Sequence, residues 1–426
     1  MYKYSMDNKR YYTLNYYLTR KFKTRVFKVS LNGNFSCPNF KNGSGCIFCS
    51  AKGSGDFAGN KEDDLLTQFN SVKEKLNNKW PDTKYIAYFQ ANTNTYAPVS
   101  VLKKKFEEVL HFKNVVGISI GTRPDCISNE CLEYLKDLNK RTHLMVELGL
   151  QSMHNNTLKL INRGHDLKCF DTCVKKLKDN NINVVVHIIN GLPNEDKNMM
   201  IDTVKHLNKL NIDGIKIHML HILKNTELEN YYKKNKFHIL TKEEYVDIVC
   251  CQIEELNENI VVHRLTGDGK KEDLVAPLWT LKKVSVLNDI DKELKRRGTY
   301  QGFKKSLINL VNLKFNKIIK NKDILINESN ITFDYKENKI YKLSEINETL
   351  NDKISLVILD YRNKSKKLDI YKYIKLLNKK GIILILLNLN DYDNICKTLK
   401  NISIEYKTYK NSYEDYLVIE IKKQII

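Results

Sequence analysis

The chain has 426 residues, of which 42% are hydrophobic and only six are proline, so its composition is that of a folded protein and excludes a disordered one. It carries 71 Lys and Arg against 50 Asp and Glu, a formal net charge of +21. An excess of this size suits a polyanionic partner. Lysine, asparagine, isoleucine and tyrosine are all abundant, however, a bias that an AT-rich genome also produces. The charge alone leaves nucleic-acid binding open.

The N-terminal sequence MYKYSMDNKRYY lacks the apolar segment of a signal peptide, and neither terminus offers an apolar span of 18 residues. We therefore expect a cytoplasmic protein that does not contact a membrane. In a reducing compartment the ten cysteines are expected to be thiols or metal ligands rather than disulfides.

From the N-terminus to about residue 303, short apolar runs alternate with stretches of helical periodicity. The predicted strands are residues 25–31, 85–89, 115–120, 143–150, 183–190, 213–219 and 259–265. The predicted helices include residues 64–77, 100–111, 128–139, 166–180, 198–210 and 241–257. This alternation predicts an α/β fold with a parallel sheet and right-handed crossovers.

The α/β pattern restarts near residue 304, which predicts two domains, residues 1–303 and 304–426. Strands are expected in the second domain at 323–327, 354–360, 382–388, 402–408 and 416–422, and helices at 365–379 and 391–401.

Polar residues follow the carboxyl ends of several strands of the first domain, where the functional groups of a parallel barrel collect. The polar residues are Gln90 and Asn92, then Thr122, Arg123 and Asp125, and then Gln151; a further loop, Gly191, Leu192 and Pro193, follows the next strand.

The loop after the first predicted strand, CPNFKNGSGCIFCSAKGSGDF, contains Cys37, Cys46 and Cys49. Thiolates are soft ligands that suit zinc or iron–sulfur sites, and Gly43 and Gly45 would let backbone N–H groups turn toward sulfur. Structural zinc requires four ligands, whereas three cysteines and no nearby histidine leave one position open. A [4Fe–4S] cluster with one iron free of protein ligands fits that count.

The three cysteines, with Phe48 before the last, resemble the cluster motif of radical S-adenosylmethionine (SAM) enzymes. Their wider spacing is similar to that of the YhcC/YtqA family, and the resemblance extends from about residue 10 to residue 303. The further segments that carry it are SGDFAG, YFQANTNTYAP, GISIGTRPDCI, ELGLQS, INRGHD, HIINGLP and HRLTGDGKKEDLVAPLW. The resemblance implies a partial (βα)6-type TIM barrel with a [4Fe–4S] cluster on Cys37, Cys46 and Cys49. It also implies that SAM binds the free iron and is cleaved by one electron to a 5′-deoxyadenosyl radical.

Matching motifs assigns roles to the polar residues. Gln151 resembles the residue that binds the ribose of SAM, and Arg163 resembles the one that binds its carboxylate. Gly191, Leu192 and Pro193 resemble the loop beside the adenine. Thr122, Arg123 and Asp125 would contact SAM or substrate, and Gln90 and Asn92 replace the more common Gly-Gly-Glu at the methionine amine. The resemblance identifies no catalytic side chain.

Each of these residues also has a structural interpretation. Gln151 and Arg163 could be surface or capping residues, and Thr122 and Asp125 could cap the following helix. His218 and His221, near Lys216, either contact substrate or complete the barrel rim.

The second domain resembles fragments of a Rossmann-type SAM-dependent methyltransferase. A working site there would need a Gly-rich turn after its first strand, but Ile326 is followed by Asn-Glu-Ser-Asn. We therefore expect a degenerate, Rossmann-like domain kept for packing or for docking RNA or a partner.

The function that the resemblance favours is radical SAM chemistry in the modification of the tRNA wobble uridine. A low-potential flavodoxin or ferredoxin would be the electron donor, and the oligomeric state is left open. One alternative is a radical SAM enzyme acting on a protein or small metabolite. Another is a non-catalytic, metal-containing RNA-binding protein.

Overall fold

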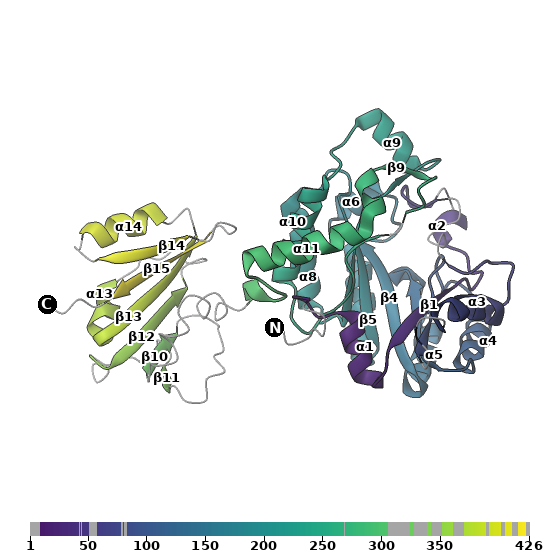
Figure 1. The fold of residues 1–426 in the computed structure, drawn as a ribbon, viewed down its shortest axis with the longest axis horizontal. Helices are drawn as coiled ribbons and strands as arrows, with labels where there is room; N and C mark the ends of the chain where they lie inside the picture. The colour runs from purple at the N-terminus through teal and green to yellow at the C-terminus, as the bar shows by residue number, and fades with distance from the viewer. Residues whose placement is uncertain are drawn as a thin grey trace. The chain divides into compact units, whose positions relative to one another are not determined.

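The structure is a computed structural model. It describes residues 9–41, 43, 45–50, 58–77, 80, 83–267, 269–305, 324–327, 339–341, 352–360, 370–388, 392–401, 405–410 and 416–422. The chain forms two compact units, Met1–Lys305 and Ser306–Ile426, both drawn in Figure 1. Within the described ranges, no helix combines the length and the apolar character needed to cross a bilayer.

A curved, seven-stranded parallel sheet forms the centre of the first unit, in the order β1-β2-β3-β4-β5-β6-β8 (Figure 1). The strands are β1 (Val26–Leu31), β2 (Lys84–Phe89), β3 (Val115–Thr122), β4 (His143–Gln151), β5 (Asn183–Asn190), β6 (Gly214–Met219) and β8 (Val261–Arg264). All seven were predicted, and each pairs in parallel with its neighbours. The sheet is a half barrel, which confirms the expected α/β fold of radical SAM type.

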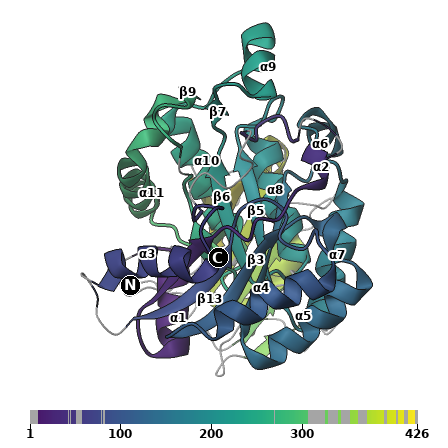
Figure 2. The same ribbon diagram turned by 90° about the vertical axis from the view of Figure 1, so that its right-hand side faces the viewer.

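Helices cover the outer face of this sheet, as α4, α5 and α7 show in Figure 2. The helices of the first unit are α1 (Leu14–Phe22), α2 (Pro38–Lys41), α3 (Leu65–Asn77), α4 (Val99–Leu110), α5 (Asn129–Arg141), α6 (Asn155–Leu160), α7 (Leu167–Asp179), α8 (Lys197–Lys209), α9 (Glu227–Asn235), α10 (Lys242–Glu255) and α11 (Lys283–Arg297), with short 3₁₀ turns at Pro124–Cys126, Leu278–Lys282 and Phe303–Lys305. A small two-stranded antiparallel sheet pairs β7 (Ile222–Leu223) with β9 (Leu274–Ala276). Side-chain caps explain several helix starts, for example Ser128 at α5 and Asp166 at α7.

Strand alternation decides which residues of β4 face the interior of the half barrel. Leu144, Val146, Leu148 and Leu150 join the large apolar core with the covering helices. Because successive side chains of a strand point to opposite faces, the intervening Glu147 points to the inner face. A carboxylate therefore lies in the interior of the barrel.

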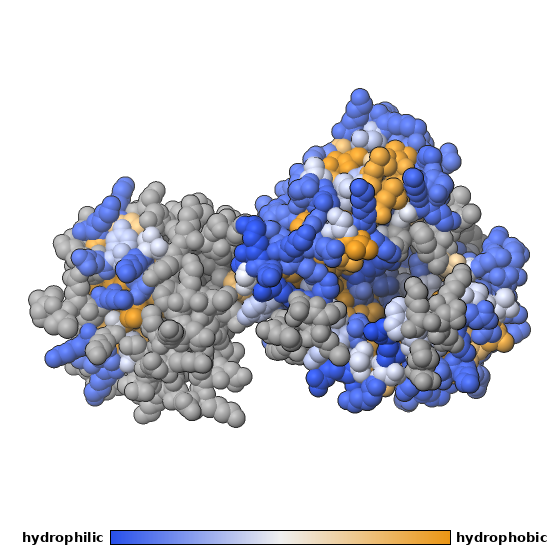
Figure 3. Space-filling view, viewed as in Figure 1, coloured by the Kyte–Doolittle hydropathy of each residue, from blue (hydrophilic) through white to orange (hydrophobic). Residues whose placement is uncertain are grey.

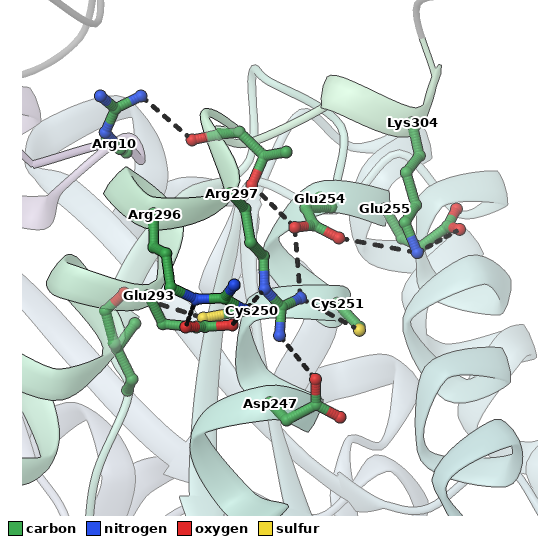
Figure 4. Close-up of polar contacts among 12 residues, drawn as sticks. Arg10, Asp247, Cys250, Cys251, Glu254, Glu255, Glu293, Arg296, Arg297 and Lys304 are labelled. Atoms are coloured by element: carbon green, nitrogen blue, oxygen red, sulfur yellow. Dashed lines mark hydrogen bonds and ion pairs between the residues drawn. The ribbon is translucent and has the colours of Figure 1, made fainter. Parts of the chain in front are cut away.

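Helices α10 and α11 are joined by an ionic network around Arg297 (Figure 4). The guanidinium contacts Asp247 at 2.5 Å, Glu293 at 2.8 Å and Glu254 at 3.3 Å, and only 1% of the Arg297 side chain is exposed. Asp247 and Glu254 lie on α10, whereas Glu293 precedes Arg297 on α11. The network therefore fixes α11 against α10, which packs in turn on α8.

The second unit has a six-stranded mixed sheet in the order β11-β10-β12-β13-β15-β14. Its strands are β10 (Ile324–Asn327), β11 (Lys339–Tyr341), β12 (Ile354–Asp360), β13 (Leu377–Asn388), β14 (Tyr406–Lys410) and β15 (Tyr416–Lys422), and its described helices are α13 (Ile370–Leu376) and α14 (Tyr392–Asn401). Strand β15 is antiparallel to β13 and β14. It is thus a smaller α/β unit, as expected.

Two details of the second unit were wrong at the sequence level. The helix predicted at 365–379 ends at Leu376, because Leu377 already pairs with Ile354 of β12 and starts strand β13. The short strand β11 was not predicted. Residues 361–369 and 402–404, parts of a predicted helix and a predicted strand, lie outside the described residues.

Candidate active site

A cavity of about 310 Å³ opens at the carboxyl ends of the barrel strands. Its walls contain all three cysteines of the predicted cluster loop and, of the predicted SAM-binding residues, Gln90, Asn92, Thr122, Arg123, Gln151 and Arg163. Residues that lie up to 126 positions apart in the sequence therefore meet in one place.

The cysteine loop is held against the segment that follows α6. The Ile47 N–H donates to the Ile161 carbonyl at 3.1 Å, and the Asn162 side chain donates to the Gly45 carbonyl at 2.7 Å. Gly45 has a φ of +85°, a conformation that glycine adopts without strain. Ile47 and Phe48 also pack on a small apolar cluster that includes Leu192. These contacts hold residues 45–48 of the loop at the barrel mouth.

Cys46 lies in a buried site with hydrogen-bond donors around its sulfur. Asn39 Nδ2 is 3.5 Å and Arg163 Nη1 3.6 Å from the Cys46 Sγ. The hydrogen bond from Cys49 and the charge of Arg163 outweigh burial and lower the pKa of the Cys46 thiol to about 5, whereas the same hydrogen bond and burial raise the pKa of Cys49. Donors around a thiolate suit the sulfur ligands of a negatively charged cluster.

Within the described part of the chain, no three His, Cys, Asp or Glu side chains converge on a single metal position. A [4Fe–4S] cluster does not require such convergence, because each thiolate binds a different iron atom. Three cysteines on the wall of one cavity therefore fit the cluster better than a single closed zinc ion.

Two arginines of the cavity have different surroundings. Arg163 donates from Nε and Nη2 to the Gly149 carbonyl, at 3.1 and 2.6 Å, so its guanidinium connects the end of β4 to Cys46. Arg123 binds Asp125 with Nε and Nη2 at 2.9 and 2.7 Å, while its buried Nη1 has no hydrogen-bond partner among the described residues. Of the two, Arg123 has the donor available for the carboxylate of SAM.

The capping alternative for Asp125 and Thr122 is wrong. Asp125 pairs with Arg123, and the helix that follows is capped by Ser128. The Thr122 hydroxyl is 2.6 Å from that of Thr95, inside the protein.

Gln151 ends β4 with a φ of +74°, in the left-handed region that non-glycine residues rarely adopt. The pairing register with β5 shifts between Gly149 and Gln151. Such strain is typical of binding sites, and here it accompanies the side chain that the resemblance assigns to the ribose. Asn92, with a φ of +60°, donates from its side chain to the Phe35 carbonyl at 3.0 Å.

The predicted adenine loop does not line this cavity. Gly191 lies beside it, in a separate small pocket next to Leu220 and Leu240, and its N–H donates to the Met200 sulfur at 3.2 Å. Leu192 and Pro193 are buried.

Sequence reasoning gave no role to Glu147, Tyr88 and His187, three polar residues of the cavity floor. Glu147, Tyr88 and His187 line the cavity together with Lys216, His218, His221 and Arg264. Glu147 stands in an apolar strand, and this was the signal that could have identified it, because an isolated carboxylate in such a strand must find charged partners. Burial opposes ionisation of Glu147, but Lys216 and Lys28 hold its pKa well below the usual range.

A cysteine-lined cavity at the mouth of a parallel half barrel defines the class of protein. The model of the radical SAM superfamily matches residues 37–207, and that of the Radical_SAM C-terminal domain matches residues 212–296. The chain is a radical SAM enzyme, and its cofactors are a [4Fe–4S] cluster and SAM.

Within this superfamily, the chain is 53% identical over 303 residues to the uncharacterized protein YtqA of Bacillus subtilis, covering 70% of this chain and 94% of YtqA. It is 32% identical over 290 residues to the protein YhcC of Escherichia coli, covering 66% of this chain and 91% of YhcC. The chain belongs to the YtqA and YhcC family. A more distant relative is the tRNA uridine(34) acetyltransferase of Methanocaldococcus infernus, 30% identical over 141 residues, which are 32% of this chain and 25% of that protein.

Proposed function

We propose that this radical SAM enzyme modifies the wobble uridine of tRNA. Support comes from the similarity to a tRNA uridine(34) acetyltransferase and from the net charge of +21, which suits a polyanionic substrate. The observation that carries the enzymatic part is the meeting of the three cysteines, Arg123 and Gln151 in one cavity.

The residues of the cavity have distinct roles in this proposal. Cys37, Cys46 and Cys49 hold the cluster, Arg123 binds the carboxylate of SAM while Asp125 orients it, and Gln151 binds the ribose. Arg163 positions Cys46 and the end of β4. When bound, the cluster and SAM would supply the one-electron chemistry that removes a hydrogen atom from the substrate.

Mass spectrometry of nucleosides tests the substrate. tRNA from cells that lack the gene should lose one modified uridine, which the wild-type gene restores and a Cys46→Ala gene does not. An unchanged nucleoside profile would contradict the tRNA assignment and leave the protein or small-metabolite alternative. Binding of tRNA to the purified protein should also weaken steeply with salt.

We further propose that the second unit is a degenerate, methyltransferase-like domain. In its sheet, β10 lies between β11 and β12, so the strand order reverses there, as it does where doubly wound folds bind cofactors. The sequence after β10 lacks the glycines that such a site needs. Equilibrium dialysis should therefore find about one SAM per full-length chain, and two per chain would contradict the proposal.

A further inference from the structure

A buried ionic cluster at the floor of the cavity has no role in the proposal above. Glu147, whose side chain is fully buried, accepts from Lys28 Nζ at 2.5 Å and Ser119 Oγ at 2.6 Å through Oε1. Its Oε2 accepts from Lys216 Nζ at 2.5 Å and from His187 Nε2 at 2.7 Å. Each oxygen thus accepts two hydrogen bonds, so the carboxylate is fully engaged by its neighbours.

Lys216 presents an unused donor to the cavity. Of its three N–H groups, one binds Glu147 and one the Tyr88 hydroxyl at 3.0 Å, and its ammonium lies 4.3 Å from the centre of the Tyr88 ring. The third has no hydrogen-bond acceptor within the described residues, although the side chain is only 9% exposed. Lys216 lines both the 310 Å³ cavity and a second cavity of about 540 Å³ that also contacts Lys28.

Among the residues that the structure describes, the charges of the cluster do not balance. Two lysines share one carboxylate, and burial lowers the pKa of His187 and His218, so both imidazoles are neutral at pH 7. A buried positive charge that lacks a counterion is costly, and an incoming anion would remove that cost. The buried Nε2 of His218, which also has no hydrogen-bond partner in the described part of the chain, lies on the wall of the same cavity.

We propose that Lys216 binds an oxyanionic group of the substrate, a carboxylate or a phosphate, at the floor of the cavity, with His218 as a second donor. The inference deepens the proposed function and rests on it, because the cavity must be the site where the substrate binds. Glu147 acts as a positioning residue that holds the ammonium between β4 and β6.

The test measures binding to the cluster-loaded protein with SAM present, by isothermal titration. The probes are uridine 5′-monophosphate, succinate and neutral uridine. At least one of the two anions should bind, and its affinity should fall on the order of tenfold to a hundredfold in Lys216→Gln. Lys216→Arg should retain most of the affinity. The control is Lys28→Gln, which removes the other lysine from the same carboxylate without changing the wall of the 310 Å³ cavity. Its anion affinity should fall less than that of Lys216→Gln.

Each outcome has a defined meaning. Binding of uridine 5′-monophosphate but not succinate would identify the anion as the phosphate of a nucleotide. Binding of succinate alone would identify it as the carboxylate of a small acid. Both results support the inference. Absence of anion binding, or equal binding to Lys216→Gln, overturns it. If Lys216→Gln weakened the binding of SAM but not that of the anions, Lys216 would belong to the cofactor site, and the inference would also be overturned. Formation of 5′-deoxyadenosine by the wild type shows separately whether the enzymatic assignment holds.

The wild-type protein offers a second test that requires no variant to fold. The groups that face Lys216 are Lys28, Tyr88, Ser119, Glu147, His187, His218, His263 and Arg264. Burial lowers the pKa of Lys216 to about 8, whereas the histidines titrate below neutral pH and the pKa of Tyr88 is raised well above its usual value. Anion affinity should therefore fall as the pH rises through about 8, and constant affinity from pH 7 to pH 9 would contradict the inference.

Discussion

At the scale of single residues, Arg123 distinguishes a cofactor site from a purely structural one. Its buried Nη1 lacks a partner among the described residues, and Asp125 holds the other side of the guanidinium. We predict that Arg123→Gln weakens SAM binding on the order of tenfold or more, because one charge-assisted hydrogen bond to SAM is lost. The cluster should be retained. Equilibrium dialysis measures the affinity, and visible absorbance monitors the cluster.

Arg141→Gln is the matched control for that variant, because Arg141 pairs with Glu107 on the surface. It should bind SAM like the wild type. Equal SAM affinity in Arg123→Gln and Arg141→Gln would remove Arg123 from the site.

Gln151 offers a test in which stability and binding change differently. A left-handed conformation costs a non-glycine residue about 1–2 kcal/mol, and glycine avoids this cost. Glycine also destabilises the fold by about 0.5–1 kcal/mol, because its unfolded chain has more conformational entropy. Gln151→Gly should therefore leave the free energy of unfolding unchanged or raise it by about 1 kcal/mol, while SAM affinity falls. Urea unfolding and dialysis check the two effects. A less stable variant with intact SAM binding would show that Gln151 is structural.

The sequence predicted the residues of the site better than their contacts. Unusual residue types after strands pointed to the cysteines, Arg123 and Gln151, and the cavity contains all of them. The contacts of Arg163 with Gly149 and Cys46 depend on the bend at the end of β4, which no local pattern encodes. Glu147 escaped notice because its neighbours in the strand make the segment resemble an apolar core strand.

At the scale of elements, the contact between α10 and α11 depends on Arg297 (Figure 4). Removing one member of a buried ion pair leaves the other uncompensated, which typically costs 3–5 kcal/mol. Because Asp247 and Glu293 are partly exposed, we predict a loss of about 3 kcal/mol in the free energy of unfolding for Arg297→Ala. Urea denaturation measures it.

The adjacent Arg296 is the control. Its side chain is 58% exposed although it also pairs with Glu293, so Arg296→Ala should cost less than about 1 kcal/mol. Similar losses in the two variants would mean that the network around Arg297 does not hold α11.

Elements with strong periodicity were predictable, and elements decided by tertiary pairing were not. The seven barrel strands and the helices between them follow from local patterns. The end of the helix predicted at 365–379 could not be predicted in this way. The helix stops there because Leu377 pairs with β12 instead of continuing the helix. The three-residue strand β11 is too short to show an alternation of its own.

At the scale of the whole molecule, the first unit contains every residue of the candidate site, and both family models match within it. Its visible face in Figure 3 is mostly hydrophilic, with an apolar area in the region of α9 and β9. YtqA, of which the match covers 94%, shows that a chain of this extent occurs without the second unit.

We therefore predict that a chain ending at Lys305 remains folded, binds the cluster and forms 5′-deoxyadenosine at a rate close to that of the full chain. Circular dichroism and product analysis check this. If the truncated protein were insoluble or inactive, the second unit would be needed for the stability or the activity of the first.

The most direct test of the central claim is the cofactor content and SAM cleavage of the anaerobically reconstituted full chain. We predict about four iron atoms per chain, visible absorbance, and 5′-deoxyadenosine formed from SAM after reduction. All three should be lost in Cys46→Ala, which stays folded, and retained in Cys169→Ala, whose thiol lies on α7 outside the cavity. A colourless protein with one tightly bound zinc ion and no 5′-deoxyadenosine would contradict the account.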